Sequence, residues 1–395
     1  MRIKEYEFNL RELSGSIGDF GTLIPLSIAL ITINGLSFSA IFLMVGAFYF
    51  LSGFYYRLPI PVQPLKVVSA VAIASPDKVT LEVMAATGLI FAAILLFLAV
   101  SGLIDQVARL FTKPIVRGIQ LGLGLVLMRK GVMFIKDKDL FVEGLTNQPM
   151  IGGMPVNLVV GMVAVLLVLL LLNNHRFPAA LVVLGAGILV GVGYGAFDGT
   201  DWGMGATDMD LYSPSLDDFW TACYLLVLPQ IPLTIGNAVI GTTDTVKMLF
   251  GKGEHSQRAT NRAFAASMGL ANIPTGLLAG MPMCHGAGGL AAHYRFGART
   301  GGSNIMIGSI FIIIALAFGV VGVAILSSIP SAVLGVLLLF AGLELALLVR
   351  DVTEKQQLFI VFLIAGIGLA TTNMGVAFGA GIVVDQVIRR ARVEI

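Results

Sequence analysis

The sequence predicts an all-α polytopic membrane protein with fourteen transmembrane segments, arranged as two inverted repeats of seven. Hydrophobic residues make up 57% of the 395 residues and charged residues 12%, whereas soluble domains carry roughly 25% charged residues. Apolar stretches close to the roughly 20 residues that cross a bilayer recur from one end of the chain to the other. In addition, a short apolar segment introduced by Gly and Pro recurs at the same place in each half.

The fourteen predicted segments follow from the apolar runs and from the Gly- and Pro-rich stretches between them. Most of these runs are long enough to span a bilayer. Two are too short, namely residues 65–74, which follow the sequence PIPVQP, and residues 287–293, which follow GMPMCHG. We expect the fourteen segments to begin near Gly18, Leu36, Val62, Val79, Pro114, Met154, Pro178, Phe219, Arg262, Met283, Asn304, Ile329, Gln356 and Asn373.

The distribution of Lys and Arg predicts the orientation. With the N-terminus in the cytoplasm, nineteen of the 25 Lys and Arg residues fall on cytoplasmic segments and five on outside loops, while Lys66 lies within the membrane. The loop 198–218, which has six aspartates and no Lys or Arg, then falls outside. Because positive charge is enriched on the cytoplasmic side, we expect both termini to be cytoplasmic. Residues 1–16 lack the apolar region of a signal peptide, so we expect no removable signal peptide. We expect an integral protein of the cell (inner or plasma) membrane.

The two halves, residues 1–200 and 201–395, contain matching features. The first has a Pro-bearing segment, GDFGTLIPLSIAL, and then the short segment PIPVQPLKVVSAVA. The second has LPQIPLTIGNAVIG and then GMPMCHGAGGLAA. The short segment is the third of seven in each half, and an odd number of segments forces the second half to run inverted. Short segments interrupted by Gly or Pro at corresponding positions of two repeats indicate a transport site.

Four stretches, GDFGTLIPL, PIPVQPLK, LPQIPLTIGNAVI and GMPMCHGAGGLAAHYRFGARTGG, resemble the signature sequences of the molybdate transporter family, which is related to the SulP sulfate permeases. The resemblance extends over the whole chain in segment order, and the last stretch is the most specific. It implies a core domain of segments 1–4 and 8–11 and a gate domain of segments 5–7 and 12–14. It also implies a substrate held between broken half-helices in segments 3 and 10.

One departure from relatives bears on energy coupling. Proton-coupled proteins of similar fold, including nucleobase permeases, carry a carboxylate in segment 8, where this chain has Gln230. The departure argues against proton coupling through this helix. Asp19, Glu344 and Asp244 are the other carboxylates that could carry a coupling proton, with helix capping or interfacial salt bridges as the alternative.

The implied arrangement of half-helices suits a small oxyanion. A bare dianion enters hydrocarbon at a cost on the order of tens of kcal/mol unless charge and hydrogen bonds replace water. A helix N-terminus offers free N–H groups and about +0.5 of effective charge, so two that meet at the midplane offer about one positive charge. Lys66, in the first turn of the first half-helix, adds another. The total approaches the charge of a tetrahedral dianion, with molybdate expected and sulfate or tungstate as alternatives.

Lys66 is the sharpest single candidate. A cation in the first turn of a helix opposes the helix dipole, and an ionisable residue within the membrane indicates function. The alternative is that Lys66 snorkels to an interface or pairs with Asp19 for structure. Gln63 and Gln230 stand beside prolines in an apolar setting, where an unsatisfied amide is costly. They would bond the substrate directly, or else satisfy backbone groups that the prolines free.

The other candidates lie in segments 1, 8 and 10. The run from Cys284 to Gly289 resembles a backbone nest for anions, in which Gly286 and Ala287 would bind while Gly288 and Gly289 serve helix packing. His285 would donate to the anion or relay a proton, or be a neutral, satisfied histidine. Thr22 and Asn237 would face the substrate or bond within and between helices. The expected substrate-binding set is Thr22, Gln63, Lys66, Gln230, Asn237, Cys284, His285, Gly286 and Ala287.

Several classes of function are disfavoured by the sequence. The two cysteines, Cys223 and Cys284, make neither a disulfide framework nor a metal site, so we expect no metal and no cofactor. Adjacent Cys284 and His285 would point about 100° apart on a helix, which argues against a catalytic pair and an enzyme. The net charge of +2 is too small to indicate a nucleic-acid partner. A nucleobase or other small-molecule permease of the same fold and an anion channel stay as alternatives, and the sequence leaves open whether the protein is a homodimer.

Overall fold

The structure, a computed structural model, describes residues 2–3, 6–108, 112–142, 148–171, 179–197, 202–251 and 253–391. The helices of the first half are α1 (Leu10–Ser16), α2 (Phe20–Asn34), α3 (Phe38–Tyr56), α4 (Lys66–Ala74), α5 (Leu81–Ser101), α6 (Ile104–Ala108), α7 (Lys113–Lys136), α8 (Val156–Leu171) and α9 (Ala179–Gly193). The predicted segment start at Pro178 and residues 392–395 lie outside the described residues.

The second half is also mainly helical. Its helices are α10 (Leu216–Ala222), η1 (Cys223–Val227), α11 (Leu228–Leu233), η2 (Thr234–Gly241), α12 (Thr242–Phe250), α13 (Glu254–Arg258), α14 (Asn261–Leu277), α15 (Ala287–Phe296), α16 (Gly301–Ala317), α17 (Gly319–Ser327), α18 (Ser331–Ala346), η3 (Leu347–Asp351), α19 (Lys355–Thr371) and α20 (Met374–Ala391). Three antiparallel pairs of two-residue strands complete the fold: β1 (Arg2–Ile3) with β2 (Tyr6–Glu7), β3 (Gln63–Pro64) with β6 (Met283–Cys284), and β4 (Met150–Ile151) with β5 (Met154–Pro155).

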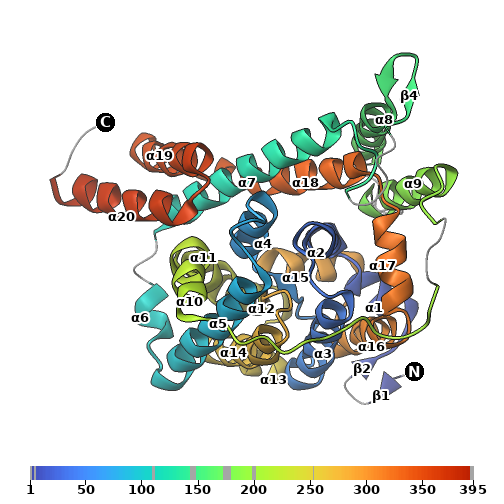
Figure 1. Ribbon diagram of the computed structural model, residues 1–395. Coiled ribbons are helices and arrows are strands. Elements are labelled where there is room, and N and C mark those ends of the chain that lie inside the picture. The colour runs from blue at the N-terminus through green and yellow to red at the C-terminus, as the bar shows by residue number, and fades with distance from the viewer. Residues whose placement is uncertain are drawn as a thin grey trace.

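The helices form two groups, which Figure 1 shows side by side. One group, here called the bundle, comprises α1 to α5 and α10 to α16. The other, here called the layer, comprises α7, α8, α9, α18, α19 and α20 and lies along one side of the bundle. The connections α6 and α17 run between them. Each group combines helices from both halves of the sequence: α3 packs along α16 and α5 along α14 in the bundle, while α7 packs along α18 and α19 in the layer.

Glycines allow the paired helices to approach closely. A Cβ atom at Gly46 would lie 2.8 Å from the carbonyl oxygen of Gly308, on the facing helix of the bundle. In the layer, a Cβ atom at Gly124 would lie 2.5 Å from the carbonyl oxygen of Gly342. Because lipid provides no hydrophobic drive for helices to associate, membrane proteins depend on such close packing of small residues. The high glycine content therefore serves the contacts between the two halves.

The chain from Leu216 to Phe250 forms one helical rod with two irregular stretches. The π-helical stretches η1 and η2 flank α11, which contains Pro229 and Pro232. Proline lacks an N–H donor and its ring crowds the carbonyl one turn earlier, so the neighbouring turns widen. As a result, the buried side chains of Gln230 and Thr234 lie on the irregular part of the rod.

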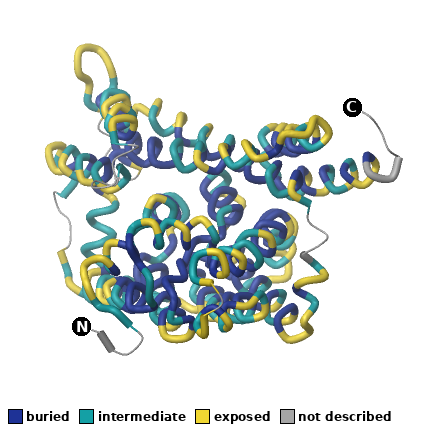
Figure 2. The backbone as a smooth tube through the Cα atoms, turned by 180° about the vertical axis from the view of Figure 1, so that it is seen from behind, coloured by how far each residue is buried: buried dark blue, intermediate teal, exposed yellow. Residues whose placement is uncertain are grey.

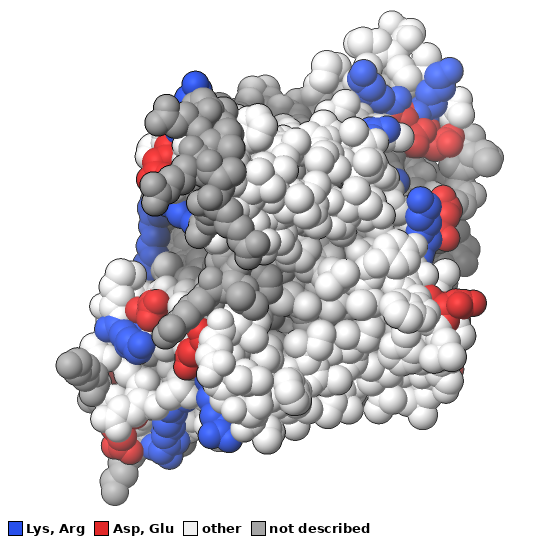
Figure 3. Space-filling model, turned by 90° about the vertical axis from the view of Figure 1, so that its left-hand side faces the viewer, with Lys and Arg blue, Asp and Glu red and all other residues white. Residues whose placement is uncertain are grey.

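The surface is that of a membrane protein. Five helical rods of the described chain are long and apolar enough to cross a bilayer, or up to seven if each of two bent helix pairs is one span, and four other apolar helices are shorter. The face in Figure 3 carries its charged residues along two opposite edges, with a broad uncharged surface between them. Buried residues gather inside the bundle and where the layer meets it (Figure 2), whereas large apolar side chains such as Leu189 and Phe362 are exposed. Fourteen spans stay a prediction, and α17 is a helix that the sequence analysis did not predict.

Candidate functional site between the bundle and the layer

A cavity of about 750 Å³ lies between the bundle and the layer. Helices α2, α4 and α15 contribute its wall on the side of the bundle, and α7, α8, α9 and α18 contribute the opposite wall. Of the residues expected from the sequence, the cavity is lined by Thr22, Gln63, Lys66, Asp19 and Glu344. Its walls therefore combine helices of both groups and both halves of the chain.

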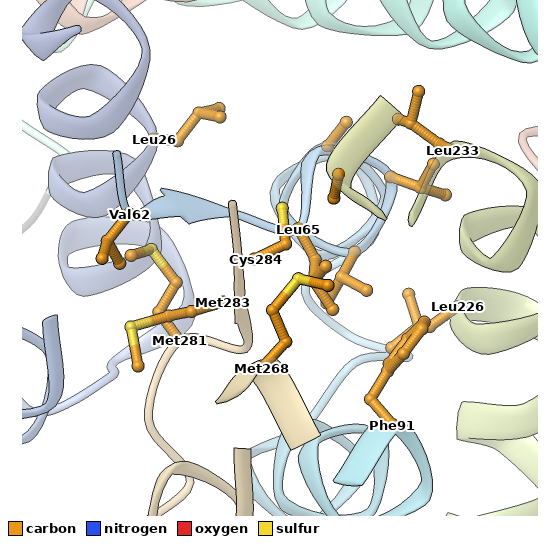
Figure 4. Packing of buried hydrophobic residues seen from close by; sticks show 14 of the residues in the cluster. Leu26, Val62, Leu65, Phe91, Leu226, Leu233, Met268, Met281, Met283 and Cys284 are labelled. Carbon is orange, nitrogen blue, oxygen red and sulfur yellow. The ribbon is translucent and has the colours of Figure 1, made fainter. Parts of the chain in front are cut away.

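Two extended stretches cross beside this cavity and start the two short helices. The strands β3 and β6 pair antiparallel, with Gln63 opposite Cys284 and Pro64 opposite Met283. The N–H of Leu65 donates to the carbonyl oxygen of Pro282 at 2.9 Å, and Leu65 lies close to Cys284 where the stretches cross (Figure 4). Helix α4 begins at Lys66 and α15 at Ala287, close to the starts expected at residues 65 and 287. Both helices thus begin at the crossing.

The N-terminus of α4 is covered by a side chain from the irregular rod. Gln230 Oε1 accepts a hydrogen bond from the N–H of Val67 at 2.7 Å. Its Nε2 donates to the hydroxyl of Thr234 at 2.9 Å. The amide is 1% exposed, so it lies behind the cavity wall rather than in it. Gln230 therefore already accepts the hydrogen bond of one N–H group that an anionic substrate would need.

The N-terminus of α15 is lined by a different glutamine. Gln63 Nε2 donates to Asp19 Oδ2 at 2.7 Å, while Gln63 Oε1 is buried and has no hydrogen-bond partner in the described part of the chain. A Cβ atom at Gly286 would collide with this Oε1, and one at Gly289 would lie 2.6 Å from Gln63 Nε2 and 2.7 Å from Asp19 Oδ2. The glycines therefore let the Gln63–Asp19 pair lie directly against the first turn of α15.

Lys66 is the cation that α4 contributes to the cavity wall. Its side chain is partly buried, and it lines the cavity together with Asp19. Within the described residues, however, Lys66 makes neither a hydrogen bond nor an ion pair with Asp19. The expected alternative of a close structural pair between these two residues does not occur in this conformation. Lys66 lines the cavity, so an anion in the cavity would lie beside it.

His285 and Cys284 lie away from the cavity. His285 is fully buried, with Nδ1 2.8 Å from the carbonyl oxygen of Pro61 and Nε2 3.1 Å from the hydroxyl of Ser267. The rings of Phe48, Tyr56 and Phe264 surround it. Cys284 is buried, with its thiol 3.8 Å from the carbonyl oxygen of Pro64. This placement favours the interpretation of His285 as a satisfied structural histidine.

The remaining predicted residues are divided between the helix starts and their surroundings. Gly286 is buried at the N-cap position of α15, and Ala287, its first residue, is partly buried. Asn237 is partly buried on η2 and does not line the cavity. Thr22 lies beside the carboxylate of Asp19 and lines the cavity. Glu344 lines the opposite wall on α18 and is exposed.

Several residues of the wall were missed by sequence reasoning, and Gly288 and Arg295 are two of them. Gly288 was expected to serve packing, yet a Cβ atom there would meet nothing within 4 Å, because the residue faces the open cavity. Arg295, further along α15, also lines the cavity. The signal for both was present in the sequence, because residues seven apart on a helix lie on the same face. In the described ranges, no group of three or more His, Cys, Asp or Glu residues could hold a metal ion.

Comparison with known sequences identifies the family. The model of a family described as "Molybdate transporter of MFS superfamily" matches residues 11–127 and 222–345. The chain is 31% identical to Molybdate transporter 2 of Arabidopsis thaliana, over 96% of this chain and 87% of that protein. It is also 31% identical to Molybdate transporter 1 of Chlamydomonas reinhardtii, over 94% of this chain and 90% of that protein.

Comparison with solved structures identifies the fold. The murine anion transporter Slc26a9 in its inward-facing state superposes with a TM-score of 0.70 and 15% identity, covering 100% of this chain and 70% of that one. The transmembrane domain of the cyanobacterial bicarbonate transporter BicA gives a TM-score of 0.65 and 14% identity, covering 93% of this chain and 96% of that one. At such identities the likeness shows the fold alone. The sequence relatives are transporters and not enzymes, and the chain belongs to the molybdate transporter family.

Proposed function

We propose that the protein is a secondary active transporter that moves a tetrahedral oxyanion, molybdate, across the membrane by alternating access. The observation that carries this proposal is the cavity that reaches Lys66 at the point where α4 and α15 both begin. The naming of the curated relatives as molybdate transporters supports molybdate as the anion. Sulfate and tungstate have the same tetrahedral shape and charge, so we expect them to compete for the site.

The site would hold the anion through charge and hydrogen bonds together. Each helix N-terminus contributes about half a positive charge and several N–H donors, and Lys66 contributes a full charge. Thr22 adds a hydroxyl on the same wall, and Gly288 leaves the approach to α15 free of side chains. Gln63 could turn its amide toward the anion, because its Oε1 has no partner in the described chain. These groups replace the hydration shell that a dianion loses on entering the membrane.

Coupling would involve the carboxylates of the cavity. An ionised Asp19 beside a bound dianion is repulsive, so a proton or cation that neutralises Asp19 would favour anion binding. Glu344, on the opposite wall, is the second candidate. Neither residue belongs to the rod that contains Gln230, and the carboxylates of that rod, Asp217 and Asp218 on α10 and Asp244 on α12, do not line the cavity.

Alternating access would arise from movement of the layer against the bundle. The proposed arrangement has two inverted repeats, residues 1–200 and 201–395, each with seven segments, and α4 and α15 as the half-helices of segments 3 and 10. The bundle would carry the anion site, while the layer would form the gate. Ser14 and Arg295 line the cavity, and both fall on segments that the Lys and Arg count places in the cytoplasm. The present conformation would then open to the cytoplasm, with both termini on that side.

Ligand-induced stabilisation of the purified protein tests the substrate class. A ligand that binds the native state raises the melting temperature by mass action, so molybdate, tungstate and sulfate should each raise it and uracil should not. Uptake of molybdate into proteoliposomes, with saturation and counterflow, then separates a transporter from a channel. A shift with uracil and none with any oxyanion would overturn the proposal in favour of a nucleobase permease.

The orientation has its own test. A cysteine introduced at Asp208, on the acidic loop, should react with an impermeant maleimide added outside intact cells. The background variant should lack Cys223 and Cys284, so that label reports position 208 alone. Labelling that requires permeabilised cells would place this loop in the cytoplasm and reverse the proposed orientation.

A further inference from the structure

The two glutamines at the crossing are used differently. At α4, the backbone N–H of Val67 can only donate, so the Gln230 atom at 2.7 Å is its amide oxygen. At α15, Gln63 bonds to Asp19 through Nε2, and its oxygen has no partner in the described chain. One helix N-terminus is therefore capped by a side-chain oxygen from another helix, whereas the corresponding oxygen at the other remains available. The capped end is the one that carries Lys66.

A second hydrogen bond holds the cap in position. Gln230 is anchored at its other end by the hydroxyl of Thr234, one helical turn away on the same rod. Both residues and Val67 are almost completely buried, so water does not compete for the bond. A free N–H in such a place would be costly, which explains why an oxygen occupies it.

We propose that Gln230 is a displaceable cap that selects for an anionic substrate: its amide oxygen holds the buried N–H of Val67, the residue after cavity-lining Lys66, until the first turn of α4 opens to the cavity and an anion oxygen takes that place. This inference rests on the proposed oxyanion site and adds a specificity-determining residue to it. An ionised oxygen accepts a stronger hydrogen bond than a neutral amide oxygen, so the exchange is favourable. A primary amide carries donors as well as an acceptor, so after rotation Gln230 donates to the anion that displaced it.

A carboxylate at the same place would behave in the opposite way. An ionised glutamate side chain there would accept from Val67 and be held by the helix dipole and by Lys66, and it would have no proton to donate. It would act as a permanent occupant of the anion position and would repel a dianion. The choice between amide and carboxylate on this helix would therefore decide whether the crossing accepts an anionic substrate.

Two variants with opposite expected effects test the cap. In Gln230→Glu the bond to Val67 is preserved, so the melting temperature without ligand should stay close to that of the wild type. Its affinity for molybdate should fall at least about 100-fold at pH 8, because like charges in one site cost several kcal/mol. In Gln230→Met, a side chain of similar length leaves Val67 uncapped, so the melting temperature should fall while affinity changes less than about tenfold.

Molybdate binding to wild type and both variants is measured by calorimetry in detergent at pH 8 and pH 5.5, with Lys78→Ala, an exposed residue outside the cavity lining, as the control. Protonation of the introduced carboxylate would restore a donor, so the affinity of Gln230→Glu should recover at the lower pH relative to wild type. Equal loss of affinity in the two Gln230 variants, or wild-type affinity in Gln230→Glu, would overturn the cap alone. A wild-type protein that binds no oxyanion would overturn the proposed function, and the cap with it.

Discussion

Helices α4 and α15 begin in the same way but present different chemistry to the cavity. The backbone arrangement is the same in both, because each helix follows a two-residue strand and the two strands pair with each other. At α4 the charge comes from a side chain, Lys66, and the backbone is capped by Gln230. At α15 the start of the helix contains three glycines, and the adjacent carboxylate of Asp19 is bonded to Gln63. One helix start supplies charge and the other supplies space.

This difference explains why both helices are needed. A dianion requires positive charge, but a long side chain at each helix start would fill the place where the anion must lie. Glycines at α15 leave that place open, as the absence of any neighbour within 4 Å of a Cβ at Gly288 indicates. Lys66 belongs to α4, so its side chain can reach the anion without filling the space at the first turn of α15. We therefore expect substitutions at the start of α4 to change the affinity for the anion, and substitutions at the start of α15 to change the shape of the binding site.

The largest expected effect belongs to Lys66. Lys66→Ala should weaken molybdate binding by about 1.4–4 kcal/mol, roughly ten- to several hundred-fold, because a charge-assisted contact is lost. Lys66→Arg should fall between, since it keeps the charge and changes the donor geometry. Calorimetry on these variants measures the effect, with Lys78→Ala, on the exposed loop after α4, as the control. Unchanged affinity in well-folded Lys66→Ala would leave the helix starts to hold the anion alone.

A double variant separates binding from structure at the same residue. If Lys66 serves mainly to balance the charge of Asp19, Lys66→Ala should lower the melting temperature and Asp19→Asn should restore much of the loss. We expect instead that the double variant regains stability without regaining affinity, because the bound anion and not Asp19 is the main partner of Lys66. Recovery of wild-type affinity in the double variant contradicts this view.

The next effect concerns space at α15. Gly289→Ala places a methyl group against Gln63 and Asp19, so it should lower stability by about 1–3 kcal/mol and disturb the binding wall. Gly288→Ala, one residue earlier, has room for its methyl group and should leave stability unchanged or slightly raised, since Ala favours helix. Thermal unfolding of the two variants measures the difference. Equal destabilisation would mean that backbone freedom, and not the Gln63–Asp19 contact, explains the glycines.

A smaller effect is expected from His285, which belongs to the crossing but not to the cavity. His285→Asn should cost about 1–3 kcal/mol of stability, because a buried ring and its bonds to Pro61 and Ser267 are lost. Molybdate affinity measured below the melting temperature should change little. A large loss of affinity with unchanged stability would assign His285 to substrate binding after all.

The smallest effect should come from a charge at the edge of the layer. Arg117 donates to both carboxylate oxygens of Asp351, at 2.9 and 2.7 Å, where both side chains are partly exposed. Because solvent screens such pairs, Arg117→Ala should cost about 1 kcal/mol or less of stability and leave affinity unchanged. Denaturant titration and calorimetry on this variant provide the baseline for Lys66→Ala. A comparable loss of affinity at Arg117 would show that charge in general, rather than charge at the crossing, drives binding.

The two short helices were predictable because their starts are encoded locally. Pro and Gly exclude a helix before Lys66 and Ala287, and an apolar run too short to span follows each. The residues that face the cavity on these helices were only partly predictable. Lys66 and Gln63 line it as expected, whereas Gly288 and Arg295 were assigned to packing and to a cytoplasmic loop. Counting along the helix from Gly288 would have placed both on one face.

The partners of the buried polar groups were not predictable. Gln63 lies 44 positions from Asp19, and Gln230 lies 163 positions from Val67, so no local pattern links them. The side-chain orientation of His285 likewise depends on the carbonyl group of Pro61, 224 positions away. The sequence could only state that each buried amide or ring must find a partner or a substrate, because unsatisfied polar groups are costly in an apolar interior.

The amino-acid sequence alone establishes the surroundings of the protein, because low charge and long apolar runs require a membrane. The two similar breaks at corresponding places predict two related halves. The tertiary structure was needed to show that the two extended stretches before α4 and α15 lie together, because the antiparallel pairing of β3 with β6 joins residues from opposite halves of the chain. The tertiary structure also shows which polar groups at this crossing are already hydrogen-bonded and which residues line the cavity. Side-chain rotamers and long-range contacts determine this division, and they are fixed by packing rather than by local sequence.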